Sequence, residues 1–374
     1  MGFPTVLILI GAVVAFTSAT TAGEEDVCLN GALRENLIVS MPRNKDMAAQ
    51  HSFRCSENTE GRLQHGMSLG FVTPWNNHGY DIAKWMGHKF THISPVWLQL
   101  RHNADMKYKI TGTHDVDAKW MREVKRKGAK IVPRLLFDGW LPQQIQELQD
   151  AKAREKIVKL ITNVVTKYGF DGIVLEGWIQ LIASGHVELA VDFIELLSNK
   201  LKELEKDFIL VIPAMRGPQT VFGSKHFDLL EEFVTAFSVM TYDYSNFMRT
   251  PGPTSPLNWL KQCVEHIVPT EGDPRRKKIL LGLNCYGYHF VSGASEPILG
   301  DKFIELVQSM KGKMKLDKEA SENYVEVRTK QGRHTIYFPT LWSIKMRLDL
   351  AEQLGIGIAM WELGQGLDYF YDLL

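Results

Sequence analysis

The sequence predicts a (β/α)8 barrel of the TIM type, with a small α+β insertion between its seventh and eighth strands. The chain has 374 residues and is 45% hydrophobic, enough to bury one large core or two modest ones. Short apolar runs alternate with longer amphipathic stretches. The runs are continuously apolar, which is typical of parallel strands buried on both faces. A doubly wound open sheet is the rival fold, but no Gly-x-Gly-x-x-Gly motif follows a strand.

Eight apolar runs are the predicted barrel strands, and each is followed by a stretch long enough for a helix. The strands are 68–73, 90–98, 131–137, 172–175, 208–213, 236–241, 279–284 and 356–361. The predicted helices are 115–127, 151–167, 187–206, 227–235, 257–267 and 341–354. The insertion, at about 291–338, should hold a helix at 300–310 and a hairpin of two alternating runs, 323–328 and 334–338.

The N-terminus predicts export from the cytoplasm. An apolar run at 6–16 is followed by small residues up to Ala22, a pattern typical of a signal peptide over 1–22. The expected location is secreted or lysosomal; an uncleaved anchor and a buried core helix remain the alternatives. Residues 23–65 have weak periodicity and predict an irregular extension, so the barrel should occupy 66–374. No later segment is apolar enough to predict a membrane span.

Charge and cysteine content narrow the function classes. Lys+Arg and Asp+Glu are equal at 43 each, so no strong field would attract nucleic acid. The four cysteines, Cys28, Cys55, Cys263 and Cys285, allow three pairings in an oxidising compartment. Cys28 with Cys55 is the most local choice, while Cys285 lies in an apolar strand and should be a buried thiol. There is no Cys-x-x-Cys pair, and neither a metal nor another cofactor is expected.

Aromatic residues gather where the barrel strands should end, which is where barrels of this type build their sites. Those at the predicted rim are Trp75, Trp97, Trp140, Trp178, Trp361, Tyr242, Tyr244, Tyr286 and Tyr288. Their flat rings suit stacking against the C–H face of a sugar. Asp243 and Asn284 would add orienting hydrogen bonds at the same rim. The sequence therefore predicts a carbohydrate cleft.

The fourth strand carries the most specific motif, Tyr-Gly-Phe-Asp-Gly-Ile-Val-Leu-Glu-Gly-Trp at 168–178. It resembles glycoside hydrolase family 18, the chitinase-like barrels, whose members read Phe-Asp-Gly and then Asp-x-Asp-x-Glu. Asp171 matches the first aspartate, whereas Val174 and Glu176 replace the next two and Trp178 replaces the catalytic glutamate. Residues 240–243 and Trp361 match the family's sixth- and eighth-strand signatures, and the resemblance covers about 67–374.

The resemblance implies a mechanism that this chain should not perform. In the family the glutamate protonates the glycosidic oxygen and the substrate's N-acetyl group is the nucleophile. The indole of Trp178 carries no titratable proton near neutral pH, and loss of a general acid costs about 10²- to 10⁴-fold in rate. Strand alternation predicts that Val174, Glu176 and Trp178 share the inward face, leaving Glu176 an acetamide-contacting or purely structural role.

Three functions follow from these observations. The preferred one is non-hydrolytic binding of chitin-type oligosaccharides, which the resemblance extends to bacterial glycans. The alternatives are a weakly active hydrolase with a displaced acid, and a scaffold for a sorting or scavenger receptor with an idle cleft. The expected saccharide-binding residues are Trp75, Trp97, Glu176, Trp178, Tyr242, Asp243, Asn284, Tyr286 and Trp361.

Overall fold

The computed structural model describes most of the predicted barrel and little of the N-terminal region. The described residues are 37–52, 66–103, 107–183, 185–217, 221–246, 248, 250–291, 293–309, 313–330 and 332–374. The predicted signal peptide, Cys28 and Cys55 lie outside these residues. Residues 37–52, the described part of the predicted irregular extension, include a short helix, α3 (Asn44–Gln50).

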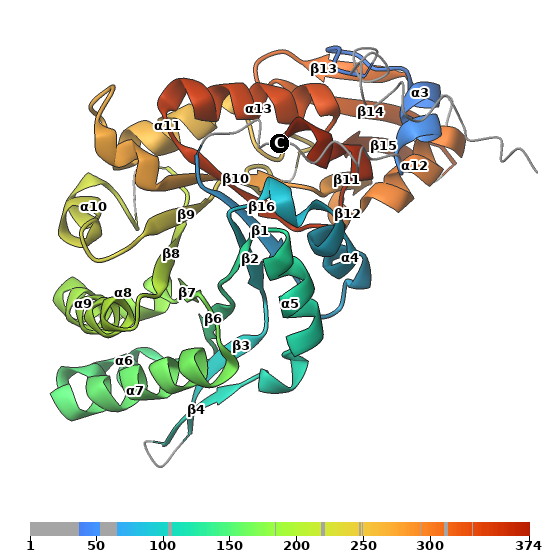
Figure 1. Cartoon of the computed structure of the whole chain (residues 1–374). Coiled ribbons are helices and arrows are strands. Elements are labelled where there is room, and N and C mark those ends of the chain that lie inside the picture. The colour runs from blue at the N-terminus through green and yellow to red at the C-terminus, as the bar shows by residue number, and fades with distance from the viewer. Residues whose placement is uncertain are drawn as a thin grey trace, which may run out of the picture.

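The barrel is formed by a curled eleven-stranded sheet, seen at the centre of Figure 1. Its parallel strands are β1 (Ser68–Val72), β2 (His92–Pro95), β3 (Leu98–Asn103), β5 (Lys130–Ile131), β6 (Arg134–Phe137), β7 (Gly172–Glu176), β8 (Asp207–Pro213), β9 (Ala236–Met240), β10 (Ile279–Asn284) and β16 (Gly357–Trp361). An antiparallel strand, β4 (Lys107–Thr111), pairs with β3. The second and third predicted strands are each interrupted, giving β2 with β3 and β5 with β6. Because β2 pairs with β5 while β3 pairs with β6, the ring of eight strand positions closes, and the fold prediction is confirmed.

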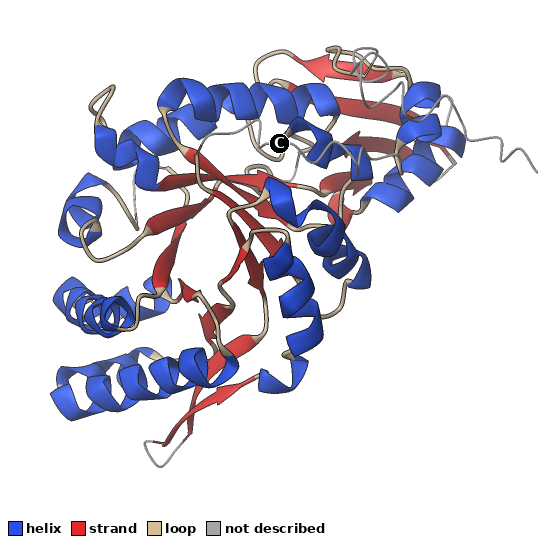
Figure 2. Cartoon of the chain, in the orientation of Figure 1, coloured by secondary structure: helices blue, strands red, loops and turns tan. Residues whose placement is uncertain are grey.

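Helices surround the sheet, as the blue and red ribbons of Figure 2 show. The long ones are α4 (Asn77–Met86), α5 (Ala118–Arg126), α7 (Ala151–Tyr168), α9 (Val187–Glu203), α11 (Leu257–Ile267) and α13 (Leu341–Leu354). Shorter ones are α6 (Pro142–Gln146), α8 (Trp178–Ile182) and α10 (Ser224–Leu230). The sequence analysis missed α4, α6 and α8. Within the described part of the chain, no helix combines the length and the apolar character needed to cross a membrane.

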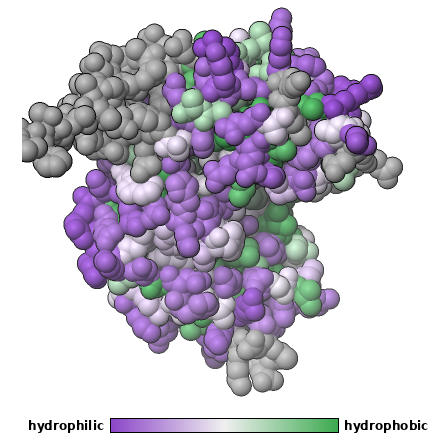
Figure 3. Space-filling view, turned by 90° about the vertical axis from the view of Figure 1, so that its right-hand side faces the viewer, coloured by the Kyte–Doolittle hydropathy of each residue, from purple (hydrophilic) through white to green (hydrophobic). Residues whose placement is uncertain are grey.

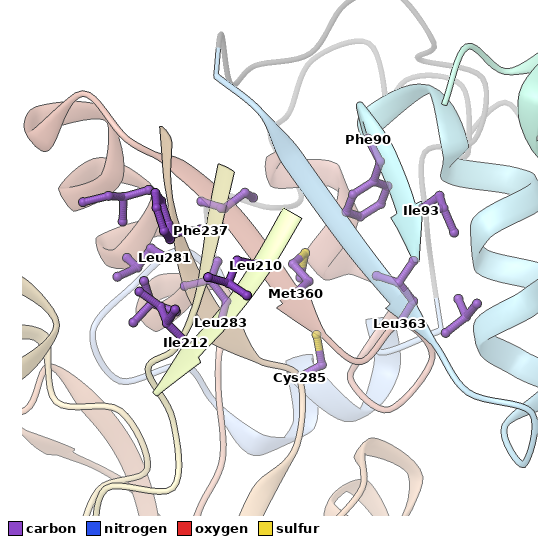
Figure 4. Packing of buried hydrophobic residues seen from close by; sticks show 14 of the residues in the cluster. Phe90, Ile93, Leu210, Ile212, Phe237, Leu281, Leu283, Cys285, Met360 and Leu363 are labelled. Atoms are coloured by element: carbon purple, nitrogen blue, oxygen red, sulfur yellow. The ribbon is translucent and has the colours of Figure 1, made fainter. Parts of the chain in front are cut away.

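The core has two layers, which explains the continuously apolar strands. Ile209 and Val211 of β8 point into the barrel, where they join Leu69, Val174 and others. The alternating residues Leu210 and Ile212 belong to the larger layer between strands and helices, part of which Figure 4 shows. Cys263 and Cys285 are free, buried thiols in that layer, as predicted for Cys285. The surface seen in Figure 3 is mainly hydrophilic, with hydrophobic residues gathered where it is hollowed.

The insertion is a second, five-stranded antiparallel sheet with the order β12-β11-β15-β14-β13. Its elements are β11 (Gly287–Val291), β12 (Ala294–Ile298), α12 (Gly300–Ser309), β13 (Met314–Asp317), β14 (Glu322–Thr329) and β15 (Gly332–Tyr337). The helix and the β14–β15 hairpin were predicted. Strand β12 was missed because four of its five residues are exposed, so it has no apolar run.

A buried carboxylate joins this sheet to the barrel. Glu322 of β14 accepts hydrogen bonds from the backbone N–H groups of Thr254 and Ser255, at 2.9 and 2.5 Å. Its Oε1 also lies 3.1 Å from Nη2 of Arg347 on α13. Burial raises the pKa of Glu322, and the Arg347 charge opposes that shift. The loop that follows β9, which carries Tyr242 and Asp243, is thereby fixed beside the insertion.

Candidate functional site

Six aromatic side chains form a contiguous cluster from the barrel mouth to the insertion, and we call them the aromatic wall. They are Trp361, Tyr286, Tyr288, Phe290, Tyr337 and Tyr324. At the barrel end the ring of Trp361 lies 5.2 Å from that of Phe71. Tyr286 and Tyr288 follow at 5.8 Å, and Tyr324 and Tyr337 stack at 5.0 Å with their planes 17° apart. Four of these rings are buried, at 5 to 7% exposed, so the accessible flat faces of the wall are those of the half-buried Trp361 and Tyr324.

Asp243 organises the hydroxyl groups at the centre of this wall. Its carboxylate accepts hydrogen bonds from the hydroxyls of Tyr286 and Tyr288, the latter at 3.0 Å. Its backbone adopts a left-handed conformation with φ 62°, which Asp tolerates better than most residues. Nη1 of Arg216 donates to its carbonyl at 3.0 Å. Burial, reinforced by the Asp243 charge, raises the pKa of both tyrosines, so their hydroxyls stay protonated.

Glu176 lies at the end of β7, on the inward face that it shares with Val174. Nη1 of Arg134, on β6, contacts its Oε2 at 2.8 Å. The two side chains are only 28% and 13% exposed. Nε of Arg134 is buried and has no hydrogen-bond partner among the described residues. Burial, and then the charge of Glu176, raise the pKa of the adjacent Tyr242 hydroxyl.

Two polar groups support the wall from behind. Nδ2 of Asn284 donates to the carbonyl of Tyr286 at 2.7 Å, so this amide holds the wall in place. Glu362 is only 1% exposed and accepts from Thr73 Oγ1 at 2.5 Å and Asn76 Nδ2 at 2.9 Å. Burial raises the pKa of the Glu362 carboxyl.

The prediction that Trp178 shares the inward face with Glu176 is wrong. Strand β7 ends at Glu176, Gly177 has φ −165° and ψ 0°, and helix α8 begins at Trp178. Because the strand ends two residues before Trp178, strand alternation does not set the direction of this indole. Trp178 is 1% exposed and packs against Phe222 and His226, with ring centroids at 5.2 and 5.3 Å.

Trp97 and Trp140 are also misplaced by the sequence analysis. Trp97 is fully buried, and its indole N–H donates to the hydroxyl of Tyr80 at 2.6 Å. Trp140 is buried against Phe137. Both rings belong to the layer between strands and helices, so neither offers an exposed face. Of the five predicted rim tryptophans, Trp75, which is 73% exposed, and the half-buried Trp361 have accessible rings.

The structure thus brings together Glu176, Tyr242, Asp243, Tyr286 and Trp361, with Asn284 behind them. Sequence reasoning missed three members of the wall, Phe290, Tyr324 and Tyr337. Two of these lie in the runs predicted as a hairpin, and pairing Tyr324 with Tyr337 across it would have placed both rings on one face.

The fold and the position of the site define the class of (β/α)8 barrels that carry their sites at the carboxyl ends of the strands. The family model described as Glycosyl hydrolases family 18 matches residues 67–366, and the chain belongs to that family. The curated relative "Putative sporulation-specific glycosylase YdhD" of Bacillus subtilis is 19% identical over 285 residues. That match covers 74% of this chain, and the chain spans 64% of the relative's length.

Solved structures agree on the fold. The spore cortex-lytic enzyme SleL of Bacillus cereus superposes with a TM-score of 0.69 at 16% identity, covering 82% of this chain and 73% of the other. A chitinase from Chromobacterium violaceum gives 0.68 at 18% identity, with 82% and 98% coverage. A family 18 chitinase from Cycas revoluta, in complex with (GlcNAc)3, gives 0.66 at 14% identity, with 82% and 97% coverage. At these identities the likeness concerns the fold.

Proposed function

We propose that this chain binds saccharides without hydrolysing them, with chitin-type oligosaccharides as the main ligands and bacterial glycans as a second class. The observation that carries the proposal is the aromatic wall, whose half-buried rings, Trp361 at the barrel mouth and Tyr324 on the insertion, rest on buried aromatic neighbours and keep accessible faces. Sugar rings stack on such faces while hydroxyl edges take their hydrogen bonds. The neighbouring protein with bound (GlcNAc)3 shares the fold and supports this ligand class.

The proposed lack of hydrolysis rests on the fourth strand. Trp178 stands where the family has its general acid, and its ring is packed against Phe222 and His226. Glu176, the nearest carboxylate in that strand, is held 2.8 Å from a guanidinium nitrogen of Arg134 and acts there as an acceptor. No proton donor of the family type is therefore available from β7.

One observation favours the second candidate, a weak hydrolase with a displaced acid. Glu176 faces the barrel interior beside Tyr242 and keeps 28% of its side chain exposed. If a ligand displaced Arg134, this carboxylate could accept a proton and become an acid. The names of the relatives, a chitinase and spore cortex-lytic enzymes, make this candidate worth a direct test.

Location and partners are further parts of the proposal. Within the family, the segments at 72–76, 95–100, 132–137 and 361–371 resemble the subgroup of chitinase domain-containing protein 1, or stabilin-interacting chitinase-like protein. That resemblance and the pattern at 1–22 support a secreted or lysosomal protein that meets a sorting or scavenger receptor. N-terminal sequencing of secreted material, expected to begin near Gly23, tests the location.

Titration with N-acetylglucosamine oligomers, followed by tryptophan fluorescence and calorimetry, tests the main proposal. The products are analysed by chromatography in parallel, with Glu176→Gln as the matched variant. Saturable binding with intact oligomers is expected. Absence of binding to folded protein would overturn the proposal, and products that disappear in Glu176→Gln would establish the displaced acid.

A further inference from the structure

A hollow of about 440 Å³ lies at the insertion end of the aromatic wall, and the function proposed above does not use it. Its lining includes Phe290, Tyr324 and Tyr337 of the wall together with Glu326, Arg333 and Thr335. Strands β14 and β15 form one of its sides. The hollow therefore continues the wall beyond its last stacked pair of rings.

The β14–β15 hairpin has one graded face, and all of its residues named in this paragraph except Arg328 line the hollow. Three directly opposed pairs occupy one face of the hairpin: Tyr324 with Tyr337, Glu326 with Thr335, and Arg328 with Arg333. Side chains of opposed residues lie on the same face, and successive pairs on that face are roughly 7 Å apart. The surface thus changes from aromatic to cationic over roughly 14 Å.

The cationic end carries an excess of positive charge in a chain whose formal net charge is zero. Glu326 accepts from Lys315 Nζ at 2.5 Å and from Arg333, so one carboxylate is shared between two cations. Arg328 is exposed and has no ion-pair partner among the described residues. Like charges placed directly opposite each other destabilise a strand pair. The Arg328–Arg333 pair therefore has a local cost that an anionic ligand would remove.

We infer that this end of the cleft binds a carboxylate group of an acidic sugar residue, in an oligosaccharide whose preceding residues stack on Tyr324 and Tyr337. The inference rests on the proposed saccharide-binding function and names its ligand class. Guanidinium groups match carboxylates through paired, parallel N–H···O bonds. The side chain of Arg333 is 65% exposed, so donors other than the one used by Glu326 face solvent.

The experiment compares three sets of oligosaccharides of equal length and closely related backbone: neutral chitin-type, carboxylate-bearing and sulfated. Each is titrated by calorimetry against the full chain, the double variant Arg328→Gln/Arg333→Gln, and a control, Lys152→Gln/Lys159→Gln. The control removes the same charge from exposed positions of α7, which lies on the opposite side of the molecule. The hairpin variant should still fold, because it removes a repulsive pair together with the exposed ion pair of Arg333 with Glu326, and such pairs contribute little to stability.

We expect the wild type to bind carboxylate-bearing oligomers about tenfold more tightly than neutral ones at low salt, and the hairpin variant to lose this preference. Neutral oligomers should bind all three proteins equally. Equal affinity of the wild type for acidic and neutral oligomers, or an equal loss in the α7 control, would overturn the inference while leaving the proposed function intact. Equal preference for sulfated oligomers would overturn the assignment to carboxylate. Failure of every oligomer to bind would instead overturn the proposed function.

Discussion

The tryptophans of the helix layer differ from those of the cleft in the hydrogen-bond acceptor of the indole N–H. Five buried tryptophans of the helix layer have a protein oxygen within 3 Å of the indole nitrogen. The pairs are Trp97 with Tyr80 Oη at 2.6 Å, Trp120 with Tyr80 O at 2.9 Å, Trp140 with Leu100 O at 2.8 Å, Trp178 with Val221 O at 2.9 Å and Trp259 with Met215 O at 2.8 Å. Trp75 and Trp361 have no such acceptor among the described residues.

This difference separates two roles for the same side chain. A buried donor without a partner costs free energy, so a ring that serves the core must have its N–H satisfied by the protein. A ring that meets a ligand keeps its polar edge for water or for the ligand. For these seven tryptophans, the N–H partner therefore indicates the role better than the position after a strand.

The largest expected effect is on the stability of the helix layer. We expect Trp178→Ala to lower the free energy of unfolding by about 3 to 5 kcal/mol, because it leaves a cavity beside Phe222 and His226. Denaturant titration measures this value, with Trp178→Phe as a control that keeps a ring and loses the N–H. An unchanged midpoint would show that the ring is not part of the core.

The next effect is on binding, at the other kind of tryptophan. We expect Trp361→Ala to weaken oligosaccharide binding by about 1 to 3 kcal/mol, as at other stacked aromatic platforms. Calorimetry on folded variant protein gives this number, and Trp361→Phe should restore part of the affinity. A binding isotherm identical to that of the wild type would remove Trp361 from the site and weaken the comparison.

The sequence was sufficient to predict the barrel because the apolar run that marks each strand is local and recurs along the chain. A run such as 208–213 is apolar at every position, and β8 (Asp207–Pro213) is buried on both faces. The direction of a side chain just beyond a strand cannot be predicted from such a run, because it depends on one or two backbone angles. At Gly177, ψ near 0° turns Trp178 from the cleft into the helix layer, and no apolar pattern encodes that turn.

The wall was partly predictable for a related reason. Tyr286 and Trp361 follow or end recognised strands, so their places at the rim could be inferred. Phe290 lies in β11, which the sequence analysis did not recognise as a strand. Its role follows from pairing between β11 and β15, which is non-local and leaves no signal in a window of the sequence.

A smaller effect is expected at Trp75, which is 73% exposed. Trp75→Ala should change the free energy of unfolding by no more than about 0.5 kcal/mol, since the ring fills no cavity. It should weaken oligosaccharide binding by less than Trp361→Ala, because an isolated exposed ring offers fewer contacts. Parallel denaturation and binding measurements test both statements. A stability loss of core size would contradict the division into two kinds of tryptophan.

The smallest effect concerns pH, and it too should fall on the helix layer rather than on the cleft. Nε2 of His78, on α4, lies 2.7 Å from a carboxylate oxygen of Asp368, and this hydrogen bond raises the pKa of His78 above 6.5. Because the folded-state pKa is the higher one, the stabilisation is complete below about pH 6.5 and is lost as pH rises through the raised value. The side chain of His78 is 43% exposed, so solvent screening limits the contribution to about 0.5 kcal/mol or less.

His78→Gln should therefore lower the melting temperature at pH 6 and match the wild type at pH 9. In the cleft, the pKa values of Tyr286 and Tyr288 are raised, so their ionisation should not affect ligand affinity over the same range. A melting curve for His78→Gln that follows the wild type at both pH values would remove this contact from the forces that hold α4 against the C-terminal segment.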